Sequence, residues 1–343
     1  MKILYSFNKV GFELDYWQRE LKYTDSNVQI IPFNHGSYIS PSFYLRAQQL
    51  DDIFYNRNKL LFDLYSKLQE LIKQNNIDCL IVDNANPYHP ELLKTLAVKK
   101  VLRTSDGPMT AYDRIFPYVH AFDAVLYHSP AYSQEINMRE KLAYLGVKEK
   151  YFWSMGSFDA LRSRASEKIL FDNERDVDIV FVGALFPNKM ELLASVKNEF
   201  GKNFKLFGLA NWKKNLYFNL KYKFPGIVRP LSFENYVPLY EKSKIGINVH
   251  NRGKYTVGGY RMFDLPANGV MQISDGEEYL EEFFKVGVEV ESYSSKEELV
   301  DKVKYYLKHD AARIKIAKAG YKKVMESYLI KDKLRELSML IKK

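Results

Sequence analysis

The sequence predicts an α/β protein with two domains of similar size, each built on a parallel β-sheet that helices cover on both faces. Short runs rich in Val, Ile and aromatic residues alternate with stretches of helical spacing, and the runs are continuously apolar. Such a pattern is typical of parallel strands buried on both faces. The series also starts afresh after a polar stretch, and 343 residues of 46% hydrophobic content suffice for two ordinary cores.

The expected elements set the domain boundaries. Residues 1–160 form the first domain, 161–175 a polar linker, 176–326 the second domain, and 327–343 a C-terminal helix that crosses back to the first domain. The expected strands are Ile3–Phe7, Val28–Phe33, Cys79–Val82, Val101–Leu102, Ala124–Tyr127 and Tyr151–Trp153 in the first domain, and Val177–Val182, Phe204–Phe207, Ile227–Val228, Ile245–Val249, Val270–Ile273 and Val288–Val290 in the second.

Composition narrows the class of protein. No apolar run approaches the ~18 residues that a membrane-spanning helix needs. Residues 1–7 are expected to be a first strand, because they lack the cleavage site and longer apolar region of a secretory signal. The single cysteine, Cys79, lies within a strand and cannot form a disulfide framework. We therefore expect a cytoplasmic protein, with the inner face of the membrane as a more specific location.

A basic stretch suggests one kind of partner. The net charge is +9, and residues 211–229 carry Lys and Arg interleaved with aromatic residues but no acid. A solvated helix whose aromatic side chains pack inward explains this pattern. Contact with a membrane surface or a phosphate-bearing ligand is the functional alternative, and under it a membrane would be a peripheral partner. No nucleic-acid-binding module accompanies the charge, and a nucleic-acid partner is not expected.

The stretch from His250 to Gly269 carries the chemistry. It follows the strand Ile245–Val249 and leads through two glycines into a short helix, where backbone N–H groups favour a phosphate. Its cations can neutralise a diphosphate, and Asp264 lies within reach of ribose hydroxyls. The alternative is a flexible loop with a Gly turn and a salt-bridged Asp. The residues expected at this donor site are Arg229, His250, Arg252, Lys254, Gly258, Gly259, Tyr260, Arg261 and Asp264.

The same stretch resembles a known family. Gly259, Asp264, Ala267 and Gly269 keep the spacing of the nucleotide-sugar signature of B-type (GT-B) glycosyltransferases. The wider context is similar to the bacterial CgeB-like, or spore-maturation-protein-like, glycosyltransferases. This resemblance implies two Rossmann-like domains facing across a cleft, the second holding a nucleotide sugar. The similar segments are Asp178–Gly183, Leu206–Gly208 with Trp212, Ser243–His250, Arg261–Asp264, Glu297–Leu299 and Ile316–Gly320, which cover most of residues 176–326.

The sequence departs from the family pattern at two positions. Asp264 replaces the usual Glu and is one methylene shorter. Thr256 stands where many retaining relatives have a second Glu, which removes a group expected to hold the donor sugar. The resemblance therefore does not carry over that retaining arrangement.

The first domain is expected to supply the acceptor site. An inverting transfer needs a general base within reach of the acceptor hydroxyl. Asp106 is the first candidate because Gly107-Pro108 gives it an exposed turn, and the resemblance points to the same place. Asp83, in a polar loop after a strand, is the second candidate, ahead of His35 and His128. Each of these residues can also be a simple cap or turn residue.

No metal or other cofactor is expected. Asp176 and Asp178 match the metal-binding Asp-x-Asp signature of A-type glycosyltransferases, but they open a strand at its amino end, away from where ligands bind. The six histidines are dispersed, and none lies in zinc-ligand spacing.

The sequence thus predicts a glycosyltransferase that moves a sugar, without a metal, from a nucleoside diphosphate sugar to a hydroxyl of a glycan, lipid-linked or protein acceptor. Two alternatives stay open. One is a sugar-nucleotide epimerase, which needs no acceptor. The other is a non-catalytic protein that binds a glycan or a nucleotide.

Overall fold

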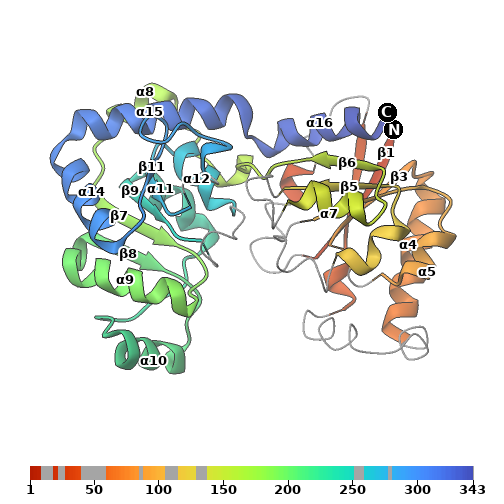
Figure 1. Cartoon of the computed structure of the whole chain (residues 1–343), viewed down its shortest axis with the longest axis horizontal. Coiled ribbons are helices and arrows are strands. Elements are labelled where there is room, and N and C mark those ends of the chain that lie inside the picture. The colour runs from red at the N-terminus through yellow and green to blue at the C-terminus, as the bar shows by residue number, and fades with distance from the viewer. Residues whose placement is uncertain are drawn as a thin grey trace. The chain divides into compact units, whose positions relative to one another are not determined.

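The computed structural model divides the chain into two compact α/β units (Figure 1). Unit 1 comprises residues 1–154 and 330–343, and unit 2 comprises residues 155–329. Each unit has its own parallel sheet and its own apolar core, which confirms two Rossmann-like α/β units. The structure describes residues 1–8, 18–21, 28–39, 59–84, 88–104, 115–128, 137–250, 259–276 and 280–342.

The sheet of unit 1 has the strand order β2-β1-β3-β4-β5-β6, and every described pair is parallel. The central strand β3 is buried at all five positions, as its uninterrupted apolar run predicts. The strands are β1 (Lys2–Phe7), β2 (Gln29–Asn34), β3 (Cys79–Asp83), β4 (Lys99–Arg103), β5 (Ala124–Tyr127) and β6 (Glu149–Phe152).

The helices of unit 1 cover this sheet with apolar faces. Helix α4 (Lys59–Asn75) buries Leu61, Leu64 and Leu68, whose spacing of three and four residues places them on one side of the helix. These side chains belong to the same core cluster as sheet residues such as Leu80. The other helices are η1 (His35–Ser37), α5 (Pro90–Thr95), η2 (Phe116–Ala121), α7 (Met138–Tyr144) and α16 (Ile330–Lys342), where η denotes a 3₁₀ helix.

The sheet of unit 2 has the order β11-β10-β9-β7-β8 and is also parallel. Two expected strands differ from the structure. Residues 227–228 lie beside β8 with only an isolated bridge between Phe207 and Arg229, and the strand expected at 288–290 is displaced to 291–292. The strands are β7 (Val177–Val182), β8 (Phe204–Phe207), β9 (Ser243–Asn248), β10 (Met271–Ser274) and β11 (Glu291–Ser292).

The helices of unit 2 pack on both faces of its sheet, and α12 and α15 pack against each other beside β10. No helix of the described residues is long and apolar enough to cross a membrane. The helices are η4 (Asp159–Leu161), α8 (Glu167–Asp172), α9 (Pro187–Phe200), η5 (Gly201–Asn203), α10 (Trp212–Tyr222), η6 (Phe233–Asn235), α11 (Tyr236–Glu241), α12 (Arg261–Ala267), α14 (Lys296–Lys308) and α15 (Asp310–Ser327).

The segment 161–175, expected to be a linker, lies within unit 2, which begins at Met155. The side chain of Asn268 ties this segment down, because it accepts from the backbone N–H of Ser163 (2.8 Å) and donates to the carbonyl of Leu161 (2.9 Å). At the other end of the chain, α16 belongs to unit 1. The indole N–H of Trp153 donates to the carbonyl of Lys333 and anchors that helix (2.9 Å).

Both sheets have the same doubly wound topology. Numbered within its own unit, each sheet contains the order 2-1-3-4-5, so the strand order reverses between β1 and β3 in unit 1 and between β7 and β9 in unit 2. Ligands of open α/β sheets bind outside the carboxyl ends of the strands at such a switch point. The topology therefore selects two places for a functional site, one in each unit.

Candidate functional site

Arg261 lies across the switch point of unit 2. From the first turn of α12, its Nε donates to the carbonyl of Val182 (2.7 Å), the last residue of β7. Its Nη1 donates to Oδ1 of Asn248 (3.2 Å), the last residue of β9. The guanidinium also stacks on Phe181, with Cζ 4.3 Å from the ring centroid. Two strand ends and one aromatic ring thus hold the cation at the place where a ligand is expected.

The residue after β7 must be small for this arrangement. A Cβ placed on Gly183 would lie 1.7 Å from Nη2 of Arg261, which no packing allows. A side chain at this position would have to displace the guanidinium. Gly183 therefore makes room for Arg261 at the carboxyl edge of the sheet.

A second cation, Lys189, comes from the first turn of α9 and was not predicted as a site residue. It is 4% exposed, and burial, reinforced by the nearby Arg261, lowers its pKa to about 7, while Asp275 acts in the opposite direction. Its position near the N-terminus of a helix is also unfavourable for a cation, because the helix dipole is positive there. Among the described residues, neither Lys189 nor Arg261 forms an ion pair with a carboxylate. A buried lysine beside a half-buried arginine, neither of them ion-paired with a described carboxylate, is suited to an anionic ligand.

The sequence contains a signal for Lys189 that the pattern analysis did not use. The buried residues of α9 include Met190, Leu193 and Ala194, and Lys189 lies on the same side of the helix, four residues before Leu193. A lysine on the core-facing side of an amphipathic helix is rare unless it has a partner or a ligand.

His250 and Asp275 join the ends of β9 and β10. The Asp275 carboxylate accepts from the backbone N–H of His250 (3.0 and 3.1 Å) and lies 2.5 Å from Nδ1 of its ring. The amide of Asn188, next to Lys189, donates to the carbonyl of His250 (3.4 Å). These contacts fix the backbone where the chain leaves β9.

Asp264 is almost fully buried, 1% exposed, on α12. Its carboxylate accepts from the hydroxyls of Ser157 (2.7 Å) and Tyr236 (3.4 Å). Burial, with Tyr240 and the Asp264 carboxylate nearby, raises the pKa of Tyr236 well above its usual value, so this hydroxyl stays a donor. Asp264 thus connects α12 to the segment that opens unit 2, and its expected ribose contact stays a prediction.

The structure describes three of the remaining expected donor-site residues, Arg229, Gly259 and Tyr260. Arg229 is exposed beside the carboxyl end of the edge strand β8, where its carbonyl accepts from the N–H of Gly208 (3.0 Å). Gly259 faces open space, and the Tyr260 ring packs against Phe158 at 4.9 Å between centroids. Arg252, Lys254 and Gly258 lie outside the described residues.

Unit 1 presents a different arrangement at its own switch point. Asp83, the last residue of β3, is buried and forms an ion pair with Arg103, the last residue of β4 (2.8 Å). The Arg103 guanidinium also lies over the Trp153 ring, 4.9 Å from its centroid. The pair fixes the orientation of the Asp83 carboxylate, while Asp106 lies outside the described residues.

The two histidines at this edge are buried. Nδ1 of His128 lies 2.9 Å from the carbonyl of Thr104, and burial together with the nearby Arg103 lowers the pKa of His128 to about 3. His128 is therefore neutral at physiological pH. Nδ1 of His35 lies 2.8 Å from the Ser6 hydroxyl, which also bonds to Tyr88 (2.6 Å).

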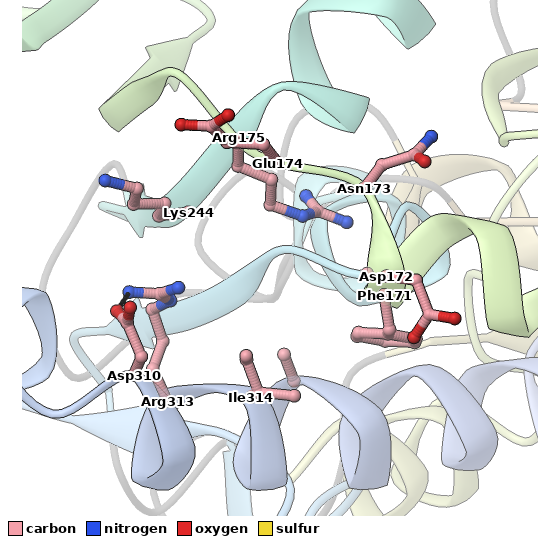
Figure 2. Close-up of a pocket in the computed structure, with 11 residues that line it drawn as sticks. Phe171, Asp172, Asn173, Glu174, Arg175, Lys244, Asp310, Arg313 and Ile314 are labelled. Carbon is pink, nitrogen blue, oxygen red and sulfur yellow. Dashed lines mark hydrogen bonds and ion pairs between the residues drawn. The ribbon is translucent and has the colours of Figure 1, made fainter.

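A cavity of about 290 Å³ lies at the opposite, amino edge of the unit 2 sheet (Figure 2). Its cations already have partners: Lys244 pairs with Asp178 (2.7 Å) and Arg313 with Asp310. Arg175, whose pKa burial lowers to about 10, holds the C-terminal end of α12. Its guanidinium donates to the carbonyls of Leu170 (3.2 Å), Tyr240 (3.0 Å), Ser243 (2.6 Å) and Asn268 (3.1 Å). Arg175, which lines this cavity, therefore holds α12 in place, and the cavity is separate from the candidate site.

Among the described residues, no three His, Cys, Asp or Glu side chains come together as a metal ion would require. Asp178 of the Asp-x-Asp sequence is engaged by Lys244 at the amino edge. Metal independence stays a prediction.

Comparisons with known proteins bear on the class of this fold. Residues 189–338 match the family described as "Glycosyl transferase-like", a region that contains Lys189, His250, Arg261 and Asp264. A search of curated proteins gives no match.

Among solved structures, sucrose-phosphate synthase from Thermosynechococcus elongatus superposes with a TM-score of 0.66 at 11% identity, covering 100% of this chain and 98% of that one. HepE from Anabaena, in complex with UDP-glucose, gives a TM-score of 0.65 at 12% identity over 100% and 99%. A glycosyltransferase from Rickettsia africae gives 0.59 at 15% identity over 99% and 97%. The fold is that of GT-B proteins, and the expected enzyme class, a glycosyltransferase, is confirmed at this level by the family match.

Proposed function

We propose that this chain transfers a sugar from a nucleoside diphosphate sugar to a hydroxyl group, and that unit 2 binds the donor at its switch point. The observation that carries the proposal is the pair of cations there, Arg261 and Lys189, without a carboxylate partner among the described residues. An anionic ligand would offset the cost of burying Lys189 beside Arg261. The UDP-glucose in the structure of HepE, which has the same fold, supports a nucleotide sugar as this ligand.

The same cations explain how the reaction would be accelerated. When the bond between the sugar and the diphosphate breaks, negative charge develops on the departing phosphate oxygens. Cations fixed in advance stabilise that charge more than they stabilise the intact donor, and this difference lowers the barrier. Arg261 is fixed by β7, β9 and Phe181, so little reorganisation is required during the reaction. The proposed transfer proceeds without a metal.

The acceptor belongs to unit 1 in this proposal. A carboxylate at its carboxyl edge, Asp106 or Asp83, would take the proton from the acceptor hydroxyl. Asp83 lies at the switch point and its orientation is fixed by Arg103. The resemblance to CgeB-like glycosyltransferases supports Asp106. The acceptor class is a glycan, a lipid-linked intermediate or a protein, with a peripheral membrane contact as part of the proposal.

The test is consumption of nucleotide sugar with and without an acceptor mixture. Release of the nucleoside diphosphate that depends on acceptor supports a transferase. Conversion of the sugar nucleotide without acceptor would show an epimerase instead. Binding without conversion under either condition would show a non-catalytic binding protein. Lys189→Met should reduce turnover, and Lys202→Met, an exposed lysine after the same helix, is the matched control.

A further inference from the structure

Helix α10 combines an uncompensated positive charge with an outward apolar surface. Residues 200–233 contain no Asp or Glu. None of the lysines on or beside this helix forms an ion pair with a described acidic residue. The cations of this stretch are Lys202, Lys205, Lys213, Lys214, Lys221, Lys223 and Arg229.

The helix has two apolar sides, and the core uses only one of them. Phe218 and Asn215 face inward and are buried. Trp212, Leu216 and Leu220 recur every four residues on another side and are 71%, 52% and 75% exposed. We call these three residues the α10 face. Leu209, in the preceding turn, is 74% exposed as well.

An apolar row of this kind differs from ordinary surface residues. Single exposed apolar side chains are common, but contiguous ones on one element mark an interaction site. Figure 1 shows α10 at the periphery of unit 2, beside α9. The exposure of the α10 face means that the unit's own core does not cover it. The surface is therefore available to a partner.

Lys213 lies next to this face, with its Nζ 5.6 Å from the Trp212 ring centroid. Further round the same helix, Nζ of Lys221 is 5.3 Å from the ring centroid of Tyr217, which is 42% exposed. Long lysine side chains can follow the apolar surface and present their ammonium groups at its border. Trp and Tyr prefer the boundary between the acyl and headgroup regions of a bilayer.

The helix is formed and anchored before any partner binds. Asn211 caps its N-terminus by accepting from the N–H of Lys214 (2.9 Å), and Lys223 ends it in the left-handed conformation. The Asn215 amide makes hydrogen bonds in both directions with the Val228 backbone (2.8 and 3.1 Å). Binding of α10 to a partner would therefore require little ordering of the chain, whereas a segment that folds on binding loses conformational entropy at that step.

We propose that the α10 face and its flanking lysines dock this protein on an anionic phospholipid bilayer, with α10 lying in the plane of the interface. Apolar residues would enter the boundary of the acyl region while ammonium groups contact lipid phosphates. Charge complementarity selects an anionic bilayer as the occupant, because the stretch carries only positive charge. This inference gives the surface for the membrane contact of the proposed function, yet it does not depend on the donor site.

The test uses the full chain with two kinds of vesicle, one of phosphatidylcholine alone and one of phosphatidylcholine and phosphatidylglycerol in equal parts. Sedimentation should show binding only to the anionic vesicles, and the binding should weaken as salt rises. The fluorescence of the wild-type protein should shift to shorter wavelength on binding, and Trp212→Phe should remove this shift.

Leu216→Ser combined with Leu220→Ser should reduce the partition coefficient about tenfold or more, since two apolar side chains lose their burial in the bilayer. Lys213→Gln should reduce it about fivefold. Ile169→Ser and Lys168→Gln, both on α8, are the matched controls and should change nothing. The melting temperature and UDP-glucose affinity of the α10 variants should stay at the wild-type values, which separates this test from that of the donor site.

Equal binding to both vesicle types, or no binding to either, would overturn the proposal. So would a reversible dimer that the Leu216→Ser, Leu220→Ser variant abolishes while vesicle binding is absent, because the α10 face would then be covered by a second copy of the chain.

Discussion

The carboxyl edges of the two sheets share one topology but handle charge in opposite ways. In unit 1, the cation beside the switch point, Arg103 at the end of β4, is buried in an ion pair with Asp83 at the end of β3. In unit 2, Arg261 and Lys189 occupy the corresponding edge without a carboxylate partner among the described residues. The difference indicates that Asp83 and Arg103 neutralise each other, whereas the cations of unit 2 suit the charged donor of the proposed function.

The largest effect is expected from the candidate base in unit 1. Asp106→Asn should lower turnover by about 10²–10⁴-fold because a general base is lost. UDP-glucose affinity should stay unchanged, since the proposed donor site lies in unit 2. Steady-state kinetics and calorimetric binding check the two halves of this expectation. Full turnover by this variant, with loss of turnover in Asp83→Asn, would move the role to Asp83.

Breaking the internal pair of unit 1 should affect stability rather than binding. Arg103→Met leaves the Asp83 carboxylate buried without its partner, and the free energy of unfolding should fall by about 3–5 kcal/mol. Chemical denaturation measures this change, and the affinity for UDP-glucose measured on the folded variant should stay at its wild-type value. Adding Asp83→Asn should recover part of the stability, whereas no recovery would show that packing on Trp153 dominates.

Replacing the arginine of unit 2, Arg261, should affect ligand binding rather than stability. Arg261→Met removes a cation from the proposed diphosphate site and should weaken UDP-glucose binding by about 1.5–3 kcal/mol, the usual range for a hydrogen bond to a charged group. Arg335→Met, at an exposed arginine in an i,i+3 ion pair, is the control. An Arg261→Met variant that keeps wild-type affinity but is much less stable would show that Arg261 is structural, as Arg103 is.

The low pKa of Lys189 should make the proposed donor binding depend on pH. The free protein has a pKa of about 7 at this group, and a bound anion should raise it. Above pH 7, binding must therefore take up a proton, and affinity should fall by at most about tenfold per pH unit. Below pH 7, Lys189 is already charged and affinity should level off. UDP-glucose is a suitable ligand because its phosphates do not titrate in this range.

Lys189→Met should bind UDP-glucose weakly at every pH, and Lys189→Arg should bind it without the decline above pH 7, since arginine stays charged. A pH profile that is identical in all three proteins would exclude Lys189 from the site.

A smaller effect distinguishes two roles for Asp264. If its carboxylate contacts ribose, Asp264→Ala should weaken nucleotide binding while Ser157→Ala, which removes only one internal partner, should not. If Asp264 acts by holding α12 against the start of unit 2, both variants should weaken binding by about 1 kcal/mol, the usual contribution of one hydrogen bond. Unchanged affinity in Asp264→Ala would show that the residue has neither role.

The sequence predicted the features that depend on local pattern. Continuous apolar runs such as Cys79–Val82 marked the strands, and the position of Arg261 soon after a strand placed it at the correct edge. The strand expected at 288–290 instead lies at 291–292. Val288 is half exposed, so the apolar residues of the expected strand are not all buried.

Features that depend on distant partners could not be predicted. Ser157, which donates to Asp264, is 107 positions away in the sequence, and no local pattern connects them. Lys189 was missed because α9 otherwise has the periodicity of a helix that packs on the sheet. The role of Lys189 as a candidate anion ligand depends on Arg261, which is distant in the sequence and is brought near it only by the fold.

The central claim is that unit 2 binds a nucleoside diphosphate between Arg261 and Lys189, and thermal shift tests it most directly. UDP, GDP, TDP and CMP would each be added to the wild-type protein and to Arg261→Met. A ligand that binds only the folded state raises the melting temperature. We predict a clear increase with one diphosphate in the wild type and a much smaller increase in the variant. No increase with any nucleotide, or the same increase in both proteins, would contradict the account.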